Sequence, residues 1–438
     1  MSLRPPTTLP DGRIDAKSLD LAGLRQLLQG TGKEEHTALQ VYKAIWQRGV
    51  TDFHEIGTIS KRSRRDLAAR AALPMLERAA RLDSDDGTRK YIWRLDDDSY
   101  VESVLIPDPD HQGGPRLTLC VSSQVGCAMA CTFCLTGDLG LKRHLLPSEI
   151  ANQLLQVRQD LDPGARITNV VMMGMGEPLH NLDNLLVALE NMTHDQALNL
   201  SHRKLTVSTV GLVPALRALS AATPVNIAVS LNATTEEQRR QVMPITRRWS
   251  LAELMDCCRE LPVPRAKRIT FEYVMMRGFN DSLDDAKRLV TLMQGVPCKI
   301  NLIPYNENPE REIRRPSDLD VWRFQDHMVH HGLHTSVRRT RGRDISAACG
   351  QLGGAEHLAR RLQPAPAGTP VAAAVEIPAE APVDPSIGWR VEQLARARRG
   401  ETRRLDDGKG DLLSPEPVAQ SAGLDGALPS PSSPPDLP

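Results

Sequence analysis

The chain has 438 residues, enough for two or three domains, and 40% of them are hydrophobic, which suits a folded core. Lys plus Arg and Asp plus Glu each number 54, so the formal net charge is zero, which excludes a simple polycation that binds nucleic acid through bulk charge. No apolar run reaches about 18 residues and the N-terminus has no apolar signal segment, so we expect a cytoplasmic protein without a transmembrane helix.

The neutral total hides an uneven distribution of charge. Residues 1–90 carry 16 basic and 12 acidic side chains, whereas residues 363–438 carry 7 basic and 11 acidic ones. The same C-terminal stretch contains 13 of the 32 prolines. A proline-rich polar segment buries too little apolar surface to offset the entropy of ordering. We therefore expect residues 356–438 to be mostly disordered.

The N-terminal region is predicted to be helical. Residues 17–82 contain three stretches with helical apolar spacing, so we assign residues 1–85 to a small accessory domain. Residues 90–106 alternate around a polar turn as a β-hairpin does, which makes residues 86–112 a connection. A basic cluster opens the third helical stretch, and a solvated face and a phosphate-contacting face are both open interpretations; it consists of Lys61, Arg62, Arg64 and Arg65.

A regular alternation of strands and helices follows. It predicts a parallel sheet, since each strand returns through a helix. Six such units are too few for a closed eight-stranded barrel, so we expect an α/β fold with a partial (β/α)6 barrel over residues 113–355, with its site at the C-terminal strand ends. The expected strands are 118–123, 168–174, 204–210, 225–231, 269–275 and 299–305, with 334–340 as a further candidate.

Three cysteines lie close together on the loop after the first barrel strand. Cys127, Cys131 and Cys134 have C-x3-C-x2-C spacing, and three thiolates suit zinc or an iron–sulfur cluster. Structural zinc needs four ligands, one more than the three loop cysteines supply. His144 is a conceivable fourth ligand, and Cys120, on the strand itself, is a poor one. Three cysteines on a four-iron cluster instead leave one iron open, which can chelate S-adenosylmethionine and initiate radical chemistry.

Other motifs follow the later strands. In GMGEPL, Gly176 allows close backbone approach and Glu177 offers an acceptor for an ammonium group, although a plain tight turn is the alternative. Several polar residues end strands where a ligand would lie, and each could instead cap the next helix. They are Ser208, Ser230, Asn232 and Asn306.

The remaining cysteines divide into two kinds. Cys257, Cys258 and Cys298 are predicted to be small buried hydrophobes. Cys349 differs, because it lies in Ala-Ala-Cys-Gly after a basic segment, and positive charge increases the thiolate fraction of a thiol. That segment contains Arg338, Arg339, Arg341 and Arg343.

Together these stretches resemble one family. The cysteine spacing and Phe133 resemble the radical S-adenosylmethionine (radical SAM) superfamily. Within it, the chain is similar over about residues 20–355 to the RlmN family of dual-specificity RNA adenine-C2 methyltransferases, whose sister enzyme Cfr methylates C8. The matching pieces are VESVLIP, TLCVSSQVGCAMACTFC, VVMMGMGEPLHNLDN, SLNA, NLIPYN and TRGRDISAACGQL.

The resemblance implies a mechanism. Adenine C2 has no acidic proton and little nucleophilicity, so a radical route is required. By residue-by-residue match, Cys349 takes a methyl group from one S-adenosylmethionine and a second one, on a [4Fe-4S] cluster held by the three loop cysteines, supplies the radical. Cys120 then resolves the protein–RNA adduct through a transient disulfide with Cys349, with Glu102 as proton acceptor.

The same match implies the cofactor contacts and the partners. The expected partners are 23S rRNA, an anticodon-loop adenine of tRNA and an electron donor, acting on a monomer. The target base must leave its stack, and the basic segments 61–65 and 338–343 become phosphate contacts. Asn232 stands where the family usually has histidine, which leaves a polar group but no imidazole. The implied S-adenosylmethionine contacts are Gly176, Glu177, Ser208, Ser230, Leu231, Asn232 and Asn306.

Two alternatives stay open at this point. One is the same chemistry at C8 of adenine, as in Cfr. The other is of a different class, a non-catalytic zinc-containing RNA-binding protein, for which the three loop cysteines would be structural ligands.

Overall fold

The computed structural model describes residues 6–30, 33–109, 111, 114–262, 268–308 and 311–357. The disorder expected for residues 356–438 therefore concerns a segment that lies almost wholly outside the described residues. Within the described ranges, no helix has the length and apolar character needed to cross a membrane.

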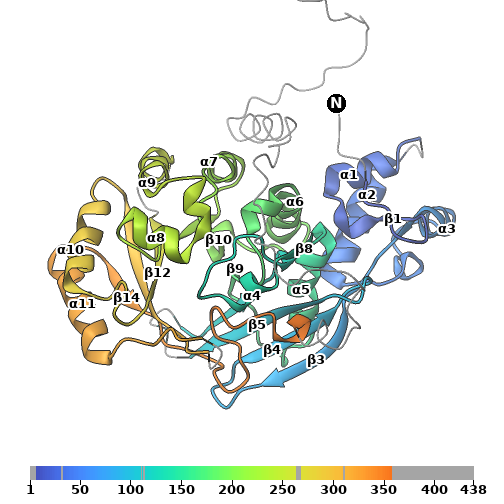
Figure 1. Ribbon diagram of the computed structural model, residues 1–438. Helices are drawn as coiled ribbons and strands as arrows, with labels where there is room; N and C mark the ends of the chain where they lie inside the picture. Colours follow the sequence, from blue (N-terminus) through green and yellow to red (C-terminus); the bar gives the residue numbers. More distant parts are fainter. Residues whose placement is uncertain are drawn as a thin grey trace, which may run out of the picture.

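The expected N-terminal helices are present as α1 (Leu21–Leu27), α2 (Glu34–Lys43) and α3 (Lys61–Arg70), at one end of the molecule (Figure 1). Local chemistry sets where they begin: Asp20 accepts a hydrogen bond from Gly23 N at 2.7 Å and caps α1. The region is tied to the rest of the chain by Tyr42, whose hydroxyl donates to Asn191 Oδ1 at 2.8 Å. A short parallel pair, β1 (Ile14–Asp15) and β2 (Ala71–Ala72), closes it.

The helical prediction was wrong for the residues that follow Pro74. Residues Glu77–Asp83 form strand β3, which pairs antiparallel with β4 (Arg89–Arg94). Proline disfavours helix continuation, and β4 offers the backbone partners that a strand needs. The predicted hairpin is confirmed, since β4 pairs antiparallel with β5 (Tyr100–Asp108).

The predicted parallel strands all form, and they join the hairpin in one ten-stranded sheet of order β14-β13-β12-β11-β10-β9-β6-β5-β4-β3. From β6 to β14 every pairing is parallel, as a partial (β/α)6 barrel requires, and β14 is the further strand expected near residue 335. These strands are β6 (Arg116–Cys120), β9 (Asn169–Met172), β10 (Leu205–Thr209), β11 (Asn226–Ser230), β12 (Ile269–Met275), β13 (Cys298–Pro304) and β14 (Thr335–Val337).

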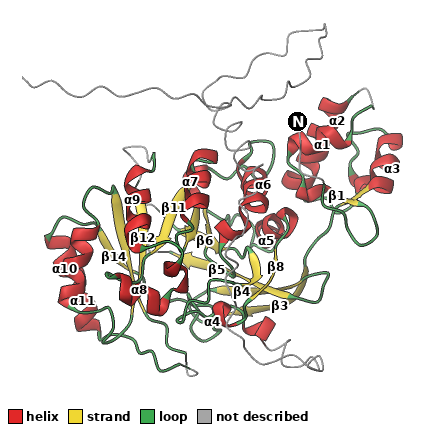
Figure 2. Ribbon diagram, turned by 45° about the horizontal axis from the view of Figure 1, so that its top comes forward, coloured by secondary structure: helices red, strands yellow, loops and turns green. Residues whose placement is uncertain are grey.

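Helices cover the outside of this sheet (Figure 2). Not anticipated were the short helices α4 (Leu135–Asp138) and α8 (Glu236–Val242), and the small hairpin of β7 (Gln124–Gly126) and β8 (Leu141–His144). The covering helices alternate with the parallel strands, as the sequence pattern predicts; they are α5 (Pro147–Gln159), α6 (Leu182–Thr193), α7 (Val213–Ala222), α9 (Leu251–Glu260), α10 (Leu283–Leu292) and α11 (Asp318–His330).

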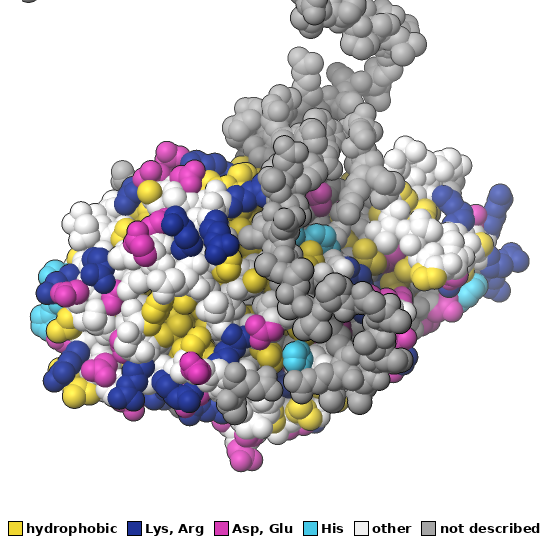
Figure 3. Space-filling view, in the orientation of Figure 1, with side chains coloured by type: hydrophobic (Ala, Val, Ile, Leu, Met, Phe, Trp, Pro, Cys, Tyr) yellow, Lys and Arg dark blue, Asp and Glu magenta, His cyan; other side chains and the backbone are white. Residues whose placement is uncertain are grey.

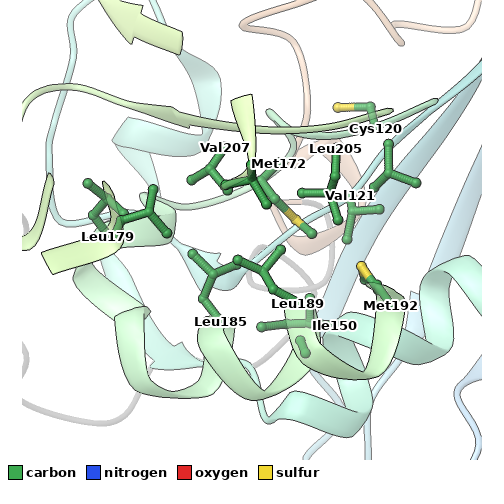
Figure 4. Close-up of a cluster of buried hydrophobic side chains, with 14 of the residues drawn as sticks. Cys120, Val121, Ile150, Met172, Leu179, Leu185, Leu189, Met192, Leu205 and Val207 are labelled. Carbon is green, nitrogen blue, oxygen red and sulfur yellow. The ribbon is translucent and has the colours of Figure 1, made fainter. Parts of the chain in front are cut away.

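The core lies between the sheet and these helices. Figure 4 shows Met172 and Val207 of the strands above Leu185 and Leu189 of α6. All four side chains are buried, and each contributes about 2 kcal/mol of favourable transfer free energy. Cys120 points to the other face of its strand, into the barrel (Figure 4).

Candidate active site

A cavity of about 160 Å³ opens at the C-terminal ends of the barrel strands. The fold therefore brings most of the predicted site residues to one place, as the strand topology requires. The predicted residues that line it are Cys127, Cys131, Cys134, Gly176, Glu177, Ser208, Ser230, Asn232, Asn306 and Cys349; Glu102, Cys120 and Leu231 lie outside its lining.

The cysteine loop is anchored by its backbone to three separate elements. Cys127 N donates to Gly140 O at 3.0 Å, which ties the start of the loop to the turn before β8. Thr132 N donates to Val242 O at 3.0 Å, at the end of α8, and Leu135 N donates to the residue after Cys349, Gly350 O, at 2.8 Å. The three thiols thus sit on a loop whose shape is set by its surroundings.

The chemistry of these thiols fits a metal-containing group. All three are free thiols, and burial raises the pKa of Cys127, Cys131 and Cys134 above the usual range. Coordination to a metal supplies the positive charge that a buried thiolate needs. His144, the conceivable fourth zinc ligand, has its Nδ1 2.9 Å from Gln124 Nε2. Among the described residues, no three His, Cys, Asp or Glu side chains converge on a single metal ion.

The glycine-rich turn packs directly on the segment that leads to the cysteines. Gly176 has a φ of +99°, and a Cβ placed there would lie 2.5 Å from Gln124 Cβ. This close approach lets Gln124 Oε1 accept a hydrogen bond from Glu177 N at 2.7 Å. Glycine is therefore required here by contact within the protein, whatever it also gives a cofactor.

Glu177 is a buried carboxylate at the cavity wall. Its Oε1 accepts from Leu179 N at 3.0 Å and its Oε2 from Val210 N at 2.9 Å. Burial nevertheless raises the pKa of Glu177 to about 7, against the opposing hydrogen bonds. A cationic ammonium group in the cavity would stabilise its charged form.

Asn232 lines the cavity, but its side chain is already engaged. Its Oδ1 accepts from Val274 N at 2.8 Å, and its Nδ2 lies 3.4 Å from the Met243 sulfur. It has a φ of +58°, in the left-handed region that asparagine tolerates better than most residues. The neighbouring Leu231 is fully buried, and its backbone N donates to Glu272 O at 3.0 Å.

Sequence reasoning missed Arg239 of α8, which is almost completely buried. Its guanidinium donates to Val210 O at 2.6 Å, to Leu231 O at 3.2 Å and to Thr246 Oγ1 at 2.9 Å. It thus joins the ends of β10 and β11, while α8 itself holds the cysteine loop through Val242. Burial lowers the pKa of Arg239 to about 10, partly offset by the Cys131 thiol.

Cys349 lines the cavity, and its thiol influences the pKa of Cys120, which is far from it in the sequence. Asn306 Nδ2 donates to Cys349 O at 3.0 Å, and Asn306 Oδ1 accepts from Thr340 Oγ1 at 2.8 Å. Both polar ends of the Asn306 side chain are therefore engaged. Burial raises the pKa of Cys120 to about 12, and its next cause is the nearby Cys349 sulfur.

Glu102 lies on β5 and is fully buried, outside the cavity lining. Its Oε1 accepts a hydrogen bond from Ala355 N at 3.1 Å, and its Oε2 lies 3.6 Å from Lys90 Nζ. The C-terminal segment that carries Cys349 therefore covers this carboxylate.

A second buried carboxylate, Glu272 of β12, does line the cavity and was not predicted. Its Oε2 accepts from Asn301 Nδ2 at 2.7 Å. The sequence held one signal for it: a single charged residue within the apolar strand ITFEYVM, where burial without a partner is rare.

Comparison with known proteins adds the family. Residues 121–290 match the model of the radical SAM superfamily, and residues 14–73 match the ribosomal RNA large subunit methyltransferase N-terminal domain. A dual-specificity RNA methyltransferase RlmN from Geobacter sulfurreducens is 50% identical over 78% of this chain and 93% of the relative. The corresponding protein from Pelobacter propionicus is 49% identical over 80% and 98%.

The fold has a solved counterpart in a radical SAM methyltransferase from Sphaerobacter thermophilus. The two share 37% identity with a TM-score of 0.72, over 77% of this chain and 98% of that one. The radical SAM superfamily implies a [4Fe-4S] cluster and S-adenosylmethionine, which three free thiols around one cavity fit. On family models, relatives and fold together, the chain belongs to the RlmN family of radical SAM RNA methyltransferases.

Proposed function

We propose that the protein methylates C2 of one adenine in 23S rRNA and of an anticodon-loop adenine in tRNA, consuming two S-adenosylmethionine molecules per turnover. The observation that carries the proposal is that Cys349 lines the same cavity as the three loop cysteines. One cavity would then hold the methyl-carrying thiol and the cluster, and Cys120, outside its lining, would supply the resolving thiol. The relatives that carry the name dual-specificity RNA methyltransferase support the choice of RNA.

The residues divide the cofactor site among themselves. Cys127, Cys131 and Cys134 would hold the cluster. When bound, the cluster and S-adenosylmethionine supply the radical that an unactivated ring carbon requires. Glu177 would accept hydrogen bonds from the ammonium group of S-adenosylmethionine. Further contacts would come from the backbone of Gly176 and Leu231 and from the polar side chains Ser208, Ser230, Asn232 and Asn306.

The thiols and Glu102 would act on the substrate. Cys349 accepts the methyl group, Cys120 releases the product by forming a disulfide with Cys349, and Glu102 takes the proton from the adenine ring. The hydrogen bond from Ala355 N to Glu102 ties that carboxylate to the Cys349 segment. Entry of the adenine would therefore displace this segment and expose the carboxylate at the same time.

RNA binding would use the basic face of α3 and the arginines that follow β14. Lys61, Arg62 and Arg65 are exposed on α3, and dark blue side chains gather at that edge of the molecule (Figure 3). We further propose that the chain divides into an accessory domain that ends at residue 85, a connection that ends at residue 112, and the barrel. The protein would act as a monomer in the cytoplasm. A separate electron donor would reduce its cluster.

Two substitutions test the proposal. Cys349→Ala should abolish RNA methylation, and Cys120→Ala should accumulate a covalent RNA–protein adduct visible on denaturing gels. Cys298→Ala, at a buried cysteine of β13 away from the cavity, is the matched control and should do neither. Full turnover by both Cys349→Ala and Cys120→Ala would contradict the proposed chemistry.

A further inference from the structure

Lys90 of β4 is buried against the segment that carries Cys349, residues 342–357, which we call the Cys349 segment. The Lys90 side chain is only 7% exposed, and lysine is rarely buried without a partner. Glu102 of β5 pairs with Ile92, which lies two positions along β4 from Lys90. Lys90 and Glu102 are therefore diagonal neighbours on one face of the hairpin, where long side chains reach each other.

The ammonium group of Lys90 contacts both Glu102 and the Cys349 segment. Its Nζ lies 3.6 Å from Glu102 Oε2 and donates a hydrogen bond to Ser346 O at 3.3 Å. Ser346 has a φ of +49°, a left-handed conformation that serine rarely adopts, so this bond lies at a strained point of the segment. Glu102 accepts on its other oxygen from Ala355 N. One buried ion pair therefore holds the segment both before and after Cys349.

The charge of Glu102 is compensated by Lys90. Within the described ranges, Glu102 Oε2 accepts no hydrogen bond, and its ion pair is with Lys90. A buried carboxylate that loses its cation is costly, because neither water nor a positive charge remains to stabilise it. Opening the Cys349 segment, which covers the carboxylate, would let water reach it. The cation at Lys90 removes this reason to open.

We propose that Lys90 is a positioning residue that acts through Glu102: its ammonium group compensates the carboxylate and so keeps the Cys349 segment closed over it until RNA enters. The catalytic meaning of this role rests on the function proposed above, in which Glu102 takes the adenine proton and Cys349 carries the methyl group. Lys90 itself makes and breaks no covalent bond. It holds the proton acceptor and the methyl carrier in a fixed relation to each other.

Amide hydrogen exchange measures this holding directly and needs neither RNA nor S-adenosylmethionine. Cluster-loaded protein is exchanged anaerobically, and peptides that cover the Cys349 segment are followed by mass spectrometry. Lys90→Met leaves the Glu102 charge uncompensated, so these amides should exchange at least about tenfold faster. The double variant Lys90→Met, Glu102→Gln removes that charge as well, so exchange should return to within about threefold of the wild type. A loss of packing alone does not predict this return.

Arg94→Met is the matched control, because it removes a cation of the same strand whose partners are Glu77 and Asp98, and it should leave the exchange unchanged. Lys90→Gln is a second neutral variant, used in the same way if Lys90→Met does not fold. Equal exchange in the wild type and the neutral variant would overturn the inference. Exchange that stays fast in the double variant would overturn it too, because Lys90 would then not act through Glu102.

RNA methylation separates this inference from the proposed function. Lys90→Met should slow methylation at least about tenfold, whereas Arg94→Met should methylate normally. A wild-type rate in Lys90→Met would overturn the positioning role in catalysis. Absence of RNA methylation in the wild type, together with the expected exchange pattern, would instead refute the proposed function while supporting the hold of Lys90 on the Cys349 segment.

Discussion

The close packing of the glycine-rich turn predicts a large effect of Gly176→Ala. The substitution places a methyl group 2.5 Å from Gln124 Cβ and 2.8 Å from Gln124 N, in a backbone conformation with φ of +99°. Left-handed strain costs about 1–2 kcal/mol and the overlap about 1–3 kcal/mol more, so we expect a loss of about 4 kcal/mol. Gly164→Ala separates the two effects, because Gly164 has a φ of +86° with nothing within 4 Å of its Cβ position.

Urea unfolding of the two variants measures this difference. With a slope of about 3 kcal/mol per molar urea, the midpoint should fall by about 1.3 M in Gly176→Ala and by about 0.5 M in Gly164→Ala. Since Gln124 also holds Glu177 N, folded Gly176→Ala should bind S-adenosylmethionine more weakly in calorimetry, whereas Gly164→Ala should bind normally. Equal midpoints for the two variants would refute the argument from close contact.

Two further substitutions test the support of the cysteine loop and the effect of a buried lysine, Lys17, in the N-terminal region. Arg239→Met detaches α8 from the strand ends, so cluster-loaded protein should lose iron to a chelator about tenfold faster, whereas its exposed neighbour variant Arg240→Met should match the wild type. Burial lowers the pKa of Lys17 to about 8, so the unfolded chain binds more protons between pH 8 and about 10.5 and stability rises with pH across that window. Lys17→Met should remove this rise of about 3 kcal/mol in pH-dependent urea unfolding, and a rise that persists would exclude Lys17 as its source.

Much of the fold was predictable because its signals are local. Strand and helix periods marked the barrel units, and residues such as Ser250, Ser282 and Ser317 cap the helices they precede. The site was predictable where it is local as well, since cysteine spacing and a glycine-rich turn are short motifs. Strand β3 was missed because its partner is supplied by the hairpin that follows it.

The rest of the site depends on contacts between distant segments. Arg239 looks like an ordinary charged residue in the sequence, and only its contacts with the ends of β10 and β11 bury it. Likewise, a basic segment before Cys349 predicts positive charge near the thiol but not which of its arginines lines the cavity, which is Arg338.

The identity of the methylated atom tests the central claim most directly. The cluster-loaded protein is incubated with 23S rRNA, S-adenosylmethionine and a reductant, and the RNA is digested to nucleosides for comparison with authentic methyladenosine isomers by mass spectrometry. We expect 2-methyladenosine, formed by the wild type and absent with Cys349→Ala. Formation of 8-methyladenosine, or of 2-methyladenosine by Cys349→Ala, would contradict it.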